Sequence, residues 1–405
     1  MTWEVRTCAS LDEQRSALGA IWHYFGRTAP SDEQFDRLAR VLPADRVHGA
    51  WDGDRVVGGA SAFPFELTVP GARIPAAGIS TVGVLPTHRR RGILSAIMRA
   101  QLDACRARGE TVAYLWASED TIYNRFGYGI ASLAAEIDIP RERTAYHAAT
   151  APSGNVRLVP PSDAEALVAP VYDKVAADTP GMFARTPAWW KSRALADPDW
   201  RRQGRGEMQC VVLEQVGHPA AYALYRLTPS WDRGVQTGTI GVIEAMGVSP
   251  EATRAIWRYL FDIDWMARVQ AGLLPVDHPL LLLLAEPRRL RLGLRDGVWV
   301  RLVDVGAALT ARTYAPGDSV VVEIGDTFCP WNAGRWRIGA RGAARVTEEP
   351  ELRCDVSALG SVYLGGFTWT QLAQSLRVDE LRPGAIARAH ALFATRRAPW
   401  CVEIF

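Results

Sequence analysis

One segment, residues 81–94, constrains the fold more than any other because it passes from a strand pattern to a helix pattern through an arginine-rich loop. Its sequence is TVGVLPTHRRRGIL, so an apolar run ends at a proline and is followed by three arginines and a glycine. Apolar residues then recur at helical spacing from Leu94 to Cys105, with charged residues between them. This order predicts a strand, a loop and a helix that begins near Arg91.

The loop at residues 89–92 has the composition of an anion-binding site. The first N–H groups of a helix lack partners within the helix, and the helix dipole makes that end positive. Guanidinium groups from Arg89, Arg90 and Arg91 would add charge-assisted hydrogen bonds, and Gly92 would let a ligand approach the backbone. The alternative is a helix that begins with solvated arginines. We predict that the loop binds a pyrophosphate.

This loop resembles the coenzyme motif of the GCN5-related N-acetyltransferases, in which an Arg/Gln-x-x-Gly-x-Gly/Ala sequence holds the pyrophosphate of acetyl-CoA. Residues 89–94 match the arginine and the first glycine, but Leu94 stands where the general motif has glycine or alanine. The departure is similar to the Eis (enhanced intracellular survival) branch, and so are residues 118–119, residues 122–129 and the terminal Phe405. The resemblance covers nearly the whole chain.

Length and composition fit a globular protein of several domains. The chain has 405 residues, more than one core usually supports, so two or three domains are expected. A net charge of +2 gives no general attraction to nucleic acid or to anionic membranes. The six cysteines are scattered without a C-x-x-C pair, which favours a reduced, cytoplasmic setting and no metal site. No signal peptide or membrane span is visible, and the aliphatic run 280–285 predicts a buried strand.

An internal repeat predicts a second copy of the first domain. The glycine and apolar residues at 217–223 resemble those at 53–59, and residues 247–250 resemble residues 83–86 at the same offset. By this offset the loop glycine falls opposite Ile256, so the second copy is expected to have lost the anion site. The alternative is a coincidence between two unrelated sheet domains.

Several local elements can be predicted within this framework. Residues 56–67 and 76–85 have the pattern of long strands, and residues 113–117 that of a short strand after the motif helix. Near the C-terminus, residues 320–324 are strand-like and residues 385–393 helical.

The predicted fold is mixed α/β (α+β), with two tandem GCN5-related acetyltransferase-like (GNAT-like) domains followed by a sterol carrier protein-like α+β domain. Residues 1–150 would hold the acetyl-CoA site, and residues 151–290 would form the degenerate second copy. A linker is expected at residues 151–155, where proline, serine and glycine cluster. Residues 291–405 resemble the domain that closes Eis-family chains, and its C-terminus is expected to enter the active site.

The resemblance implies a coenzyme site formed by the motif strand, the loop and the end of the next strand. In the parent fold the motif strand bulges and pairs with the pantetheine arm, and one of its N–H groups faces the thioester carbonyl. The coenzyme contacts implied in this sequence are Val82, Gly83, Val84, Arg90, Arg91, Gly92, Ile93, Leu94, Ser95, Ser118 and Glu119.

Tyr123 is the predicted general acid for the departing thiolate. Ser118 would cap the helix that follows Trp116 and would place Tyr123 about one turn and a half into it. A phenol with an ordinary pKa of about 10 is a credible donor to a thiolate. Tyr123 also matches the Eis-family acid by position. Tyr128 is the alternative acid, and either ring could serve only in core packing.

The general base implied by the resemblance is the carboxylate of Phe405. The chain ends in WCVEIF, which is apolar where most termini are polar and frayed, so we expect it to be buried in the cleft of the first domain. Its ordinary pKa of roughly 3.3 to 3.7 makes it a weak base unless burial raises the value. The alternative is a tail that closes its own domain with a solvated carboxylate. His88, among arginines, is expected to shape the loop rather than to take a proton.

The leading functional hypothesis is transfer of acetyl from acetyl-CoA to primary amines of aminoglycosides or similar polyamine-like acceptors, as the resemblance implies. Aromatic and acidic residues from Trp22 to Asp36 could line a pocket for cations, or could form amphipathic helices with a solvated acidic face. One alternative is an N-acetyltransferase for lysine side chains on proteins or peptides. Another is a non-catalytic lipid- or CoA-binding protein. The resemblance further implies a homohexamer, a trimer of dimers.

Overall fold

The computed structural model describes residues 3–148 and 154–405. The chain forms two compact units. The first comprises Met1–Ser132, Gly297–Pro399 and Ile404–Phe405, and the second comprises Leu133–Asp296 and Trp400–Glu403. Of the expected linker at 151–155, residues 151–153 lie outside the described residues. The domain limits near 150 and 290 stay a prediction.

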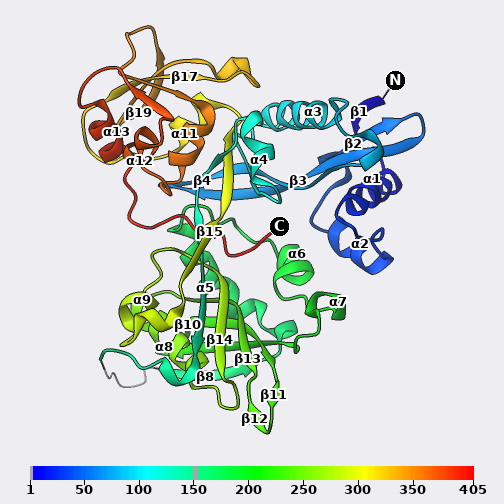
Figure 1. The fold of residues 1–405 in the computed structure, drawn as a ribbon, viewed down its shortest axis with the longest axis vertical. Coiled ribbons are helices and arrows are strands. Elements are labelled where there is room, and N and C mark those ends of the chain that lie inside the picture. The colour runs from blue at the N-terminus through cyan, green and yellow to red at the C-terminus, as the bar shows by residue number, and fades with distance from the viewer. Residues whose placement is uncertain (1–2, 149–153) are drawn as a thin grey trace. The chain divides into compact units, whose positions relative to one another are not determined.

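The first unit contains a seven-stranded sheet in the order β1-β2-β3-β4-β5-β16-β6 (Figure 1). Its strands are β1 (Trp3–Thr7), β2 (Val47–Asp52), β3 (Arg55–Val69), β4 (Ala72–Val84), β5 (Val112–Trp116), β6 (Gly129–Ile130) and β16 (Val298–Leu302). The helices of this part are α1 (Leu11–Tyr24), α2 (Asp32–Ala39), α3 (Ile93–Ala107) and α4 (Asp120–Tyr123).

The predicted strand–loop–helix segment is present. β3 and β4 form a long antiparallel ladder, and β4 and β5 are parallel, with α3 as the connection between them. The apolar face of α3 is buried, as the helical pattern predicts. The helix begins at Ile93 rather than near Arg91, because Gly92 has a left-handed φ of 80° and ends the non-helical loop.

The rest of the first unit is a smaller α+β domain with a five-stranded sheet, in the order β19-β18-β17-β20-β21. The predicted strand at 320–324 and helix at 385–393 are confirmed. The elements are α10 (Val305–Ala311), β17 (Val320–Gly325), β18 (Gly334–Gly339), β19 (Gly342–Val346), β20 (Leu352–Asp355), α11 (Val356–Tyr363), α12 (Trp369–Gln374), β21 (Val378–Glu380) and α13 (Ala385–Phe393).

The second unit is built on another seven-stranded sheet, in the order β15-β7-β14-β13-β10-β9-β8. Its strands are β7 (Leu133–Pro140), β8 (Asn155–Val159), β9 (Met208–Gln215), β10 (His218–Thr228), β13 (Thr239–Gly247), β14 (Arg268–Leu274) and β15 (Gly293–Asp296), beside the short hairpin β11 (Trp231–Asp232) and β12 (Val235–Gln236). Its helices are α5 (Glu165–Ala177), α6 (Pro187–Trp189), α7 (Asp199–Arg202), α8 (Pro250–Asp262) and α9 (Leu280–Leu283).

The second sheet repeats the central pattern of the first. β10 and β13 are antiparallel, β13 and β14 are parallel, and α8 connects the latter two. The expected counterpart of the loop glycine was misplaced, however. Ile256 lies fully buried in the middle of α8, because this helix already begins at Pro250. The offset found in the sequence therefore ends at the helix start, and the arginine loop has no counterpart there.

The strand expected at 280–285 is wrong. The first four of these residues form the short helix α9 (Leu280–Leu283), which follows Pro279 at its N-cap. Leu280 and Leu284 are buried, but Leu282 is 83% exposed, so a run of aliphatic residues here does not mark a core strand. No helix in the described parts of the chain is long and apolar enough to cross a membrane.

Candidate active site

The arginine loop ends at a helix N-terminus that is open to solvent. Within residues 3–148 and 154–405, no side chain caps α3 at Gly92, and a Cβ atom placed on this glycine would meet nothing within 4 Å. Arg90 has a left-handed φ of 61°. Arg89, Arg90 and Arg91 are all exposed. Free helix N–H groups and guanidinium groups therefore share one accessible surface, which suits a pyrophosphate.

His88 precedes the arginines of the loop, and two neighbouring side chains hold its ring. Its Nδ1 lies 2.8 Å from the hydroxyl of Thr87, and its Nε2 lies 3.3 Å from a carboxylate oxygen of Asp52. Both ring nitrogens thus have partners, which agrees with a role in shaping the loop.

The motif strand bulges immediately before the loop. The β3–β4 register shifts between the pairs Gly59–Gly83 and Ser61–Ser80, and Thr81 has a left-handed φ of 48°. In the described ladder, β5 pairs with β4 only at residues 76–78. The two parallel strands separate beyond that point, so the free edge of β4 at residues 82–84 can accept a pantetheine arm.

Among the predicted coenzyme contacts, several can offer only their backbone. The side chains of Val82, Val84 and Ile93 are buried in the core of the domain. Leu94 packs against the same core and is half-buried, whereas Ser95 is exposed in the first turn of α3.

Ser118 and Glu119 follow β5 and are exposed, and the structure adds an unpredicted neighbour. The hydroxyl of Tyr24, at the end of α1, donates to Glu119 at 3.0 Å. The same ring covers Gly83, because a Cβ atom there would lie 3.1 Å from Tyr24, and Arg89 stacks on it at 5.0 Å. The sequence placed Tyr24 only in a possible acceptor wall, and nothing in its spacing indicates contact with the motif strand.

Tyr123 is the last residue of α4 and is buried. The predicted Ser118 cap is wrong: α4 begins at Asp120, and its N-cap is Glu119 without a side-chain hydrogen bond. Burial, with Tyr24 and Glu119 nearby, raises the pKa of Tyr123 to about 12, although a hydrogen bond with Ser118 opposes the rise.

Tyr128 packs against Tyr123, with ring centroids 5.8 Å apart. It is fully buried, and this burial raises its pKa well above the ordinary value. Its hydroxyl has no hydrogen-bond partner in the described structure. Tyr128 is thus a core ring, and Tyr123 lies nearer the residues that follow β5.

The C-terminal residue lies on the first sheet. The Ser80 hydroxyl donates to a carboxylate oxygen of Phe405 at 2.9 Å. The Phe405 ring is surrounded by aromatic residues, with centroids 5.1 Å from Phe65 and 4.9 Å from Tyr114. Gly78 is required here, since a Cβ atom would collide with Phe65 and would lie 3.2 Å from Phe405. The terminal carboxylate is therefore fixed beside the β4 bulge.

The acidic residues of α2 are less available than their spacing suggests. Asp32 forms an ion pair with Arg15 at 2.6 Å, and Glu33 forms one with Arg37 at 3.0 Å. These pairs favour a solvated helix face over an acidic wall.

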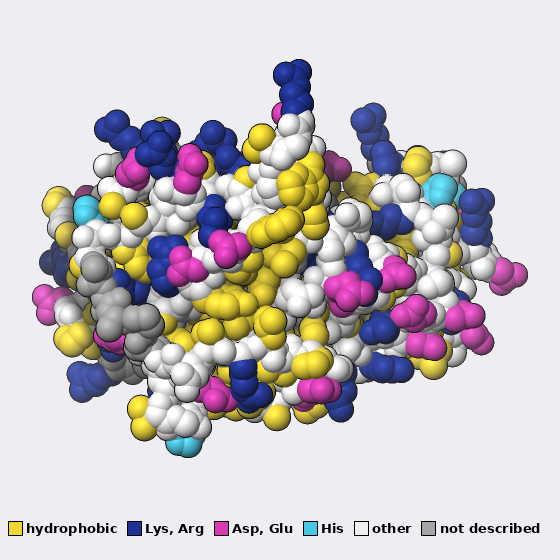
Figure 2. All heavy atoms as spheres, turned by 90° about the horizontal axis from the view of Figure 1, so that it is seen from below, with side chains coloured by type: hydrophobic (Ala, Val, Ile, Leu, Met, Phe, Trp, Pro, Cys, Tyr) yellow, Lys and Arg dark blue, Asp and Glu magenta, His cyan; other side chains and the backbone are white. Residues whose placement is uncertain are grey.

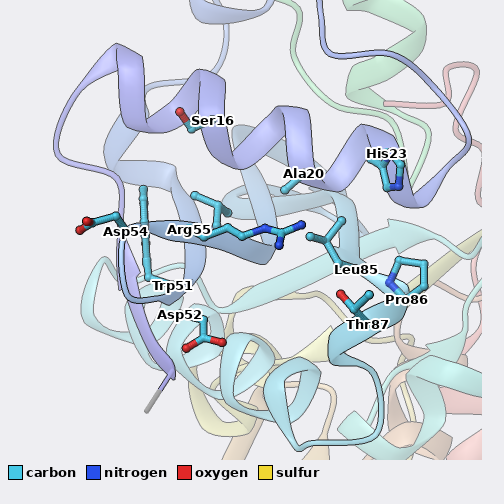
Figure 3. A pocket seen from close by; sticks show the side chains of 11 residues that line it. Ser16, Ala20, His23, Trp51, Asp52, Asp54, Arg55, Leu85, Pro86 and Thr87 are labelled. Atoms are coloured by element: carbon cyan, nitrogen blue, oxygen red, sulfur yellow. The ribbon is translucent and has the colours of Figure 1, made fainter. Parts of the chain in front are cut away.

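A cavity of about 860 Å³ lies beside residues 85–87, which lead into the arginine loop (Figure 3). Residues of α1, of the β2–β3 turn and of 85–87 line it, and its charged groups include Asp54 and Arg55. None of the lining residues belongs to the predicted coenzyme set. Across the described parts of the chain, no cluster of three or more histidine, cysteine or acidic side chains is placed to hold a metal ion.

Comparison with known families covers most of the chain. Residues 9–131 and residues 181–302 each match a model of the acetyltransferase (GNAT) domain, and residues 305–402 match the sterol carrier protein domain. The predicted fold, with two tandem acetyltransferase-like domains and a sterol carrier protein-like domain, is confirmed.

Individual relatives agree with these matches. The chain is 42% identical to an uncharacterized N-acetyltransferase of Streptomyces avermitilis over 99% of both chains. It is 36% identical to N-acetyltransferase Eis of Mycobacterium tuberculosis, over 86% of this chain and 85% of that protein.

The solved structures include Eis1 from Mycobacterium abscessus, with 38% identity, a TM-score of 0.87 and coverage of 99% of this chain and 100% of that one. A GCN5-related N-acetyltransferase from Anabaena variabilis shares the fold with a TM-score of 0.85 at 20% identity, over 100% of both chains. The chain therefore belongs to the Eis family of acetyl-CoA-dependent N-acetyltransferases.

Proposed function

We propose that this protein acetylates primary amines of aminoglycosides or similar polycationic acceptors, with Tyr123 as general acid and the Phe405 carboxylate as general base. The observation that carries the proposal is the hydrogen bond from Ser80 to the terminal carboxylate, next to the β4 bulge. It fixes a base beside the site where β4 and β5 separate, in the unit that also contains Tyr123.

Acetyl-CoA fits the residues present. Arg90, Arg91 and the open N-terminus of α3 would hold the pyrophosphate, with Gly92 leaving space for it. The free edge of β4 at residues 82–84 would pair with the pantetheine arm, and a backbone N–H there would stabilise negative charge on the thioester oxygen.

The Tyr123 phenol and the Phe405 carboxylate together account for the protons of the reaction. The amine nitrogen attacks the thioester carbon, the C–S bond breaks, and the departing sulfur takes the phenolic proton of Tyr123. The second proton, which the nitrogen loses as it becomes an amide, restores the Tyr123 phenol. A pKa of about 12 keeps this phenol protonated at neutral pH. The attacking amine must first be neutral, so its ammonium proton passes to the Phe405 carboxylate, which the Ser80 hydroxyl orients.

The acceptor class rests on charge and on the family resemblance. A cationic amine is attracted by the terminal carboxylate and by Glu119, which is exposed near the same strand ends. Lysine side chains on peptides carry the same ammonium group and are the second candidate. On the face in Figure 2, basic and acidic side chains are intermixed, which supports partners other than nucleic acid. The homohexamer and the cytoplasmic location remain proposals from the resemblance and the composition.

The test measures thiol release from acetyl-CoA against a panel of aminoglycosides and lysine peptides. The native chain is compared with a chain extended by one glycine after Phe405, which moves the carboxylate off Ser80 while keeping the aromatic ring. Activity on aminoglycosides that collapses on extension supports the proposal. Preference for peptides would shift the acceptor class, and activity unaffected by the extension would remove the carboxylate as base. Tight acetyl-CoA binding without turnover on any amine would favour a binding protein.

A further inference from the structure

Residues Trp400–Glu403 belong to the second unit, and the first three of them are buried there. The Trp400 backbone N–H donates to Pro180 at 2.8 Å, and its indole N–H donates to the carbonyl of Leu273 at 2.6 Å. Trp400 and Val402 also contribute to a hydrophobic core of the second unit. The tail is thus anchored before it reaches the first sheet.

The next residue of the tail, Glu403, belongs to a buried cluster of charged side chains. Arg185 donates to both carboxylate oxygens of Glu244, at 2.9 and 2.7 Å, and lies 3.1 Å from Glu403. The indole of Trp189 donates to the same Glu403 oxygen at 2.8 Å. The side chains of Arg185, Glu244 and Glu403 are only 1%, 3% and 12% exposed.

Such a cluster is a poor way to gain stability. Removing charges from water costs several kcal/mol per ion, and well-packed apolar residues often replace a buried ion pair without loss. Burial by itself lowers the pKa of Arg185, but Glu244 and Glu403 outweigh it and hold that pKa well above its ordinary value. The ion pairs do, however, hold each partner in one defined position. Because Glu403 belongs to the tail, they also fix the position of the tail.

Glu403 stands two residues before the chain end. Two extended residues span at most about 7 Å, so a fixed Glu403 limits the positions that the terminal carboxylate can reach. At the far end of this short span, Ser80 holds that carboxylate. The tail is therefore held at both ends.

We propose that the ion pair between Arg185 and Glu403 positions the Phe405 carboxylate for proton transfer, which makes Glu403 a positioning residue. This inference rests on the proposed role of the carboxylate as base. It also gives the second acetyltransferase-like domain a task in the reaction, since Arg185 and Glu244 both belong to it.

The test uses the full chain with Glu403→Gln, which keeps the side-chain volume and leaves Arg185 paired with Glu244. The matched control is Glu214→Gln, which removes a carboxylate of the same unit that pairs with Arg157 at the surface. We expect Glu403→Gln to lower kcat about 10- to 100-fold with KM for acetyl-CoA unchanged, because a small misplacement of a reacting group is costly. Carboxypeptidase A should also release Phe405 faster from this variant than from the control.

The outcomes separate the two proposals. Native kcat in Glu403→Gln, together with loss of turnover on glycine extension, overturns the positioning role and leaves the base in place. Release of Phe405 no faster than from the control overturns it as well. Turnover indifferent to the glycine extension overturns the base, and with it the reason for positioning.

Discussion

The two acetyltransferase-like domains differ most where a central strand passes into a helix. In the first, residues 85–92 separate β4 from α3, and this loop carries the arginines. In the second, only Val248 and Ser249 separate β13 from α8. The same strand order thus supports an anion site in one copy and a direct turn in the other, and loop length decides between them.

The helix ends show the same contrast. Gly92 leaves the first turn of α3 without a side-chain cap, whereas the Ser249 hydroxyl accepts from the N–H of Ala252 at 3.2 Å, with Pro250 in the first turn. A capped helix has already satisfied a donor that a phosphate would need. The second domain has a different role at its corresponding strand: Glu244 lies beside the β13 bulge and belongs to the cluster that holds the tail, as Ser80 holds it beside the β4 bulge.

The substitution with the largest expected effect is Gly92→Glu, which would give the first domain an obstructed helix end. A negative side chain at a left-handed φ adds strain and repels phosphate, so measurable acetyl-CoA binding should disappear in calorimetry. The control, Glu251→Gln at the start of α8, should bind like the native protein. Binding that survives Gly92→Glu would locate the pyrophosphate elsewhere.

Tyr123→Phe should lower kcat by about 100-fold or more while KM for acetyl-CoA changes little, because the phenol acts only as a proton donor. Steady-state kinetics with a saturating amine measures this. Tyr259→Phe removes a hydroxyl of the second domain, which lies 3.1 Å from that of Tyr225, and should leave kcat unchanged. A larger loss in Tyr128→Phe than in Tyr123→Phe would transfer the acid role to Tyr128.

Acid sensitivity should be a property that both units share. Burial, with Arg108 nearby, lowers the pKa of His48 to about 4 in the first unit, and burial lowers that of His278 to about 3 in the second. Each imidazole stays neutral when folded but takes a proton when unfolded below pH 6.5, so stability falls as the pH falls from that value. At pH 5 each histidine lowers the free energy of unfolding by up to about 2 kcal/mol.

Thermal unfolding at pH 7 and pH 5 measures this effect. His48→Gln and His278→Gln should each reduce the difference between the two midpoints. A native-sized difference in either variant would show that the acid sensitivity arises from other groups.

The smallest effect is expected for Ser249→Ala, which removes the cap of α8. It should cost about 1 kcal/mol of stability and leave turnover unchanged. Denaturant unfolding followed by circular dichroism measures the loss, and Ser95→Ala, inside the first turn of α3, is the comparison in the other domain. A change in acetyl-CoA binding in Ser249→Ala would contradict the assignment of a single coenzyme site.

The sequence predicted the features that depend on local pattern. The strand–loop–helix segment, the helix at 385–393 and the repeat of the first domain all follow from periodicity and glycine positions, and the structure has them. The aliphatic run at 280–285 misled because periodicity cannot tell a short helix from a strand when every residue is leucine-like. The end of the repeat at Pro250 was missed because an alignment by constant offset ignores loop deletions.

The contacts of the site depend on residues that are distant in the chain. Ser80 meets Phe405, and Tyr24 covers Gly83 and bonds to Glu119, without any signal in their spacing. The only local hint was the apolar C-terminus, which indicates burial but not the surface that receives it. Pairings of this kind are set by the tertiary fold, and a single sequence leaves them undetermined.

The position of β16 bears on how the chain matures. This strand lies between β5 and β6 in the first sheet, yet along the chain it follows Leu133–Asp296, which make up most of the second unit. During synthesis the ribosome therefore releases β5 and β6 long before β16, the strand that pairs with both. Until then the edges of β5 and β6 that face β16 have no strand to pair with. Completion of the first sheet is thus delayed until Leu133–Asp296 have emerged.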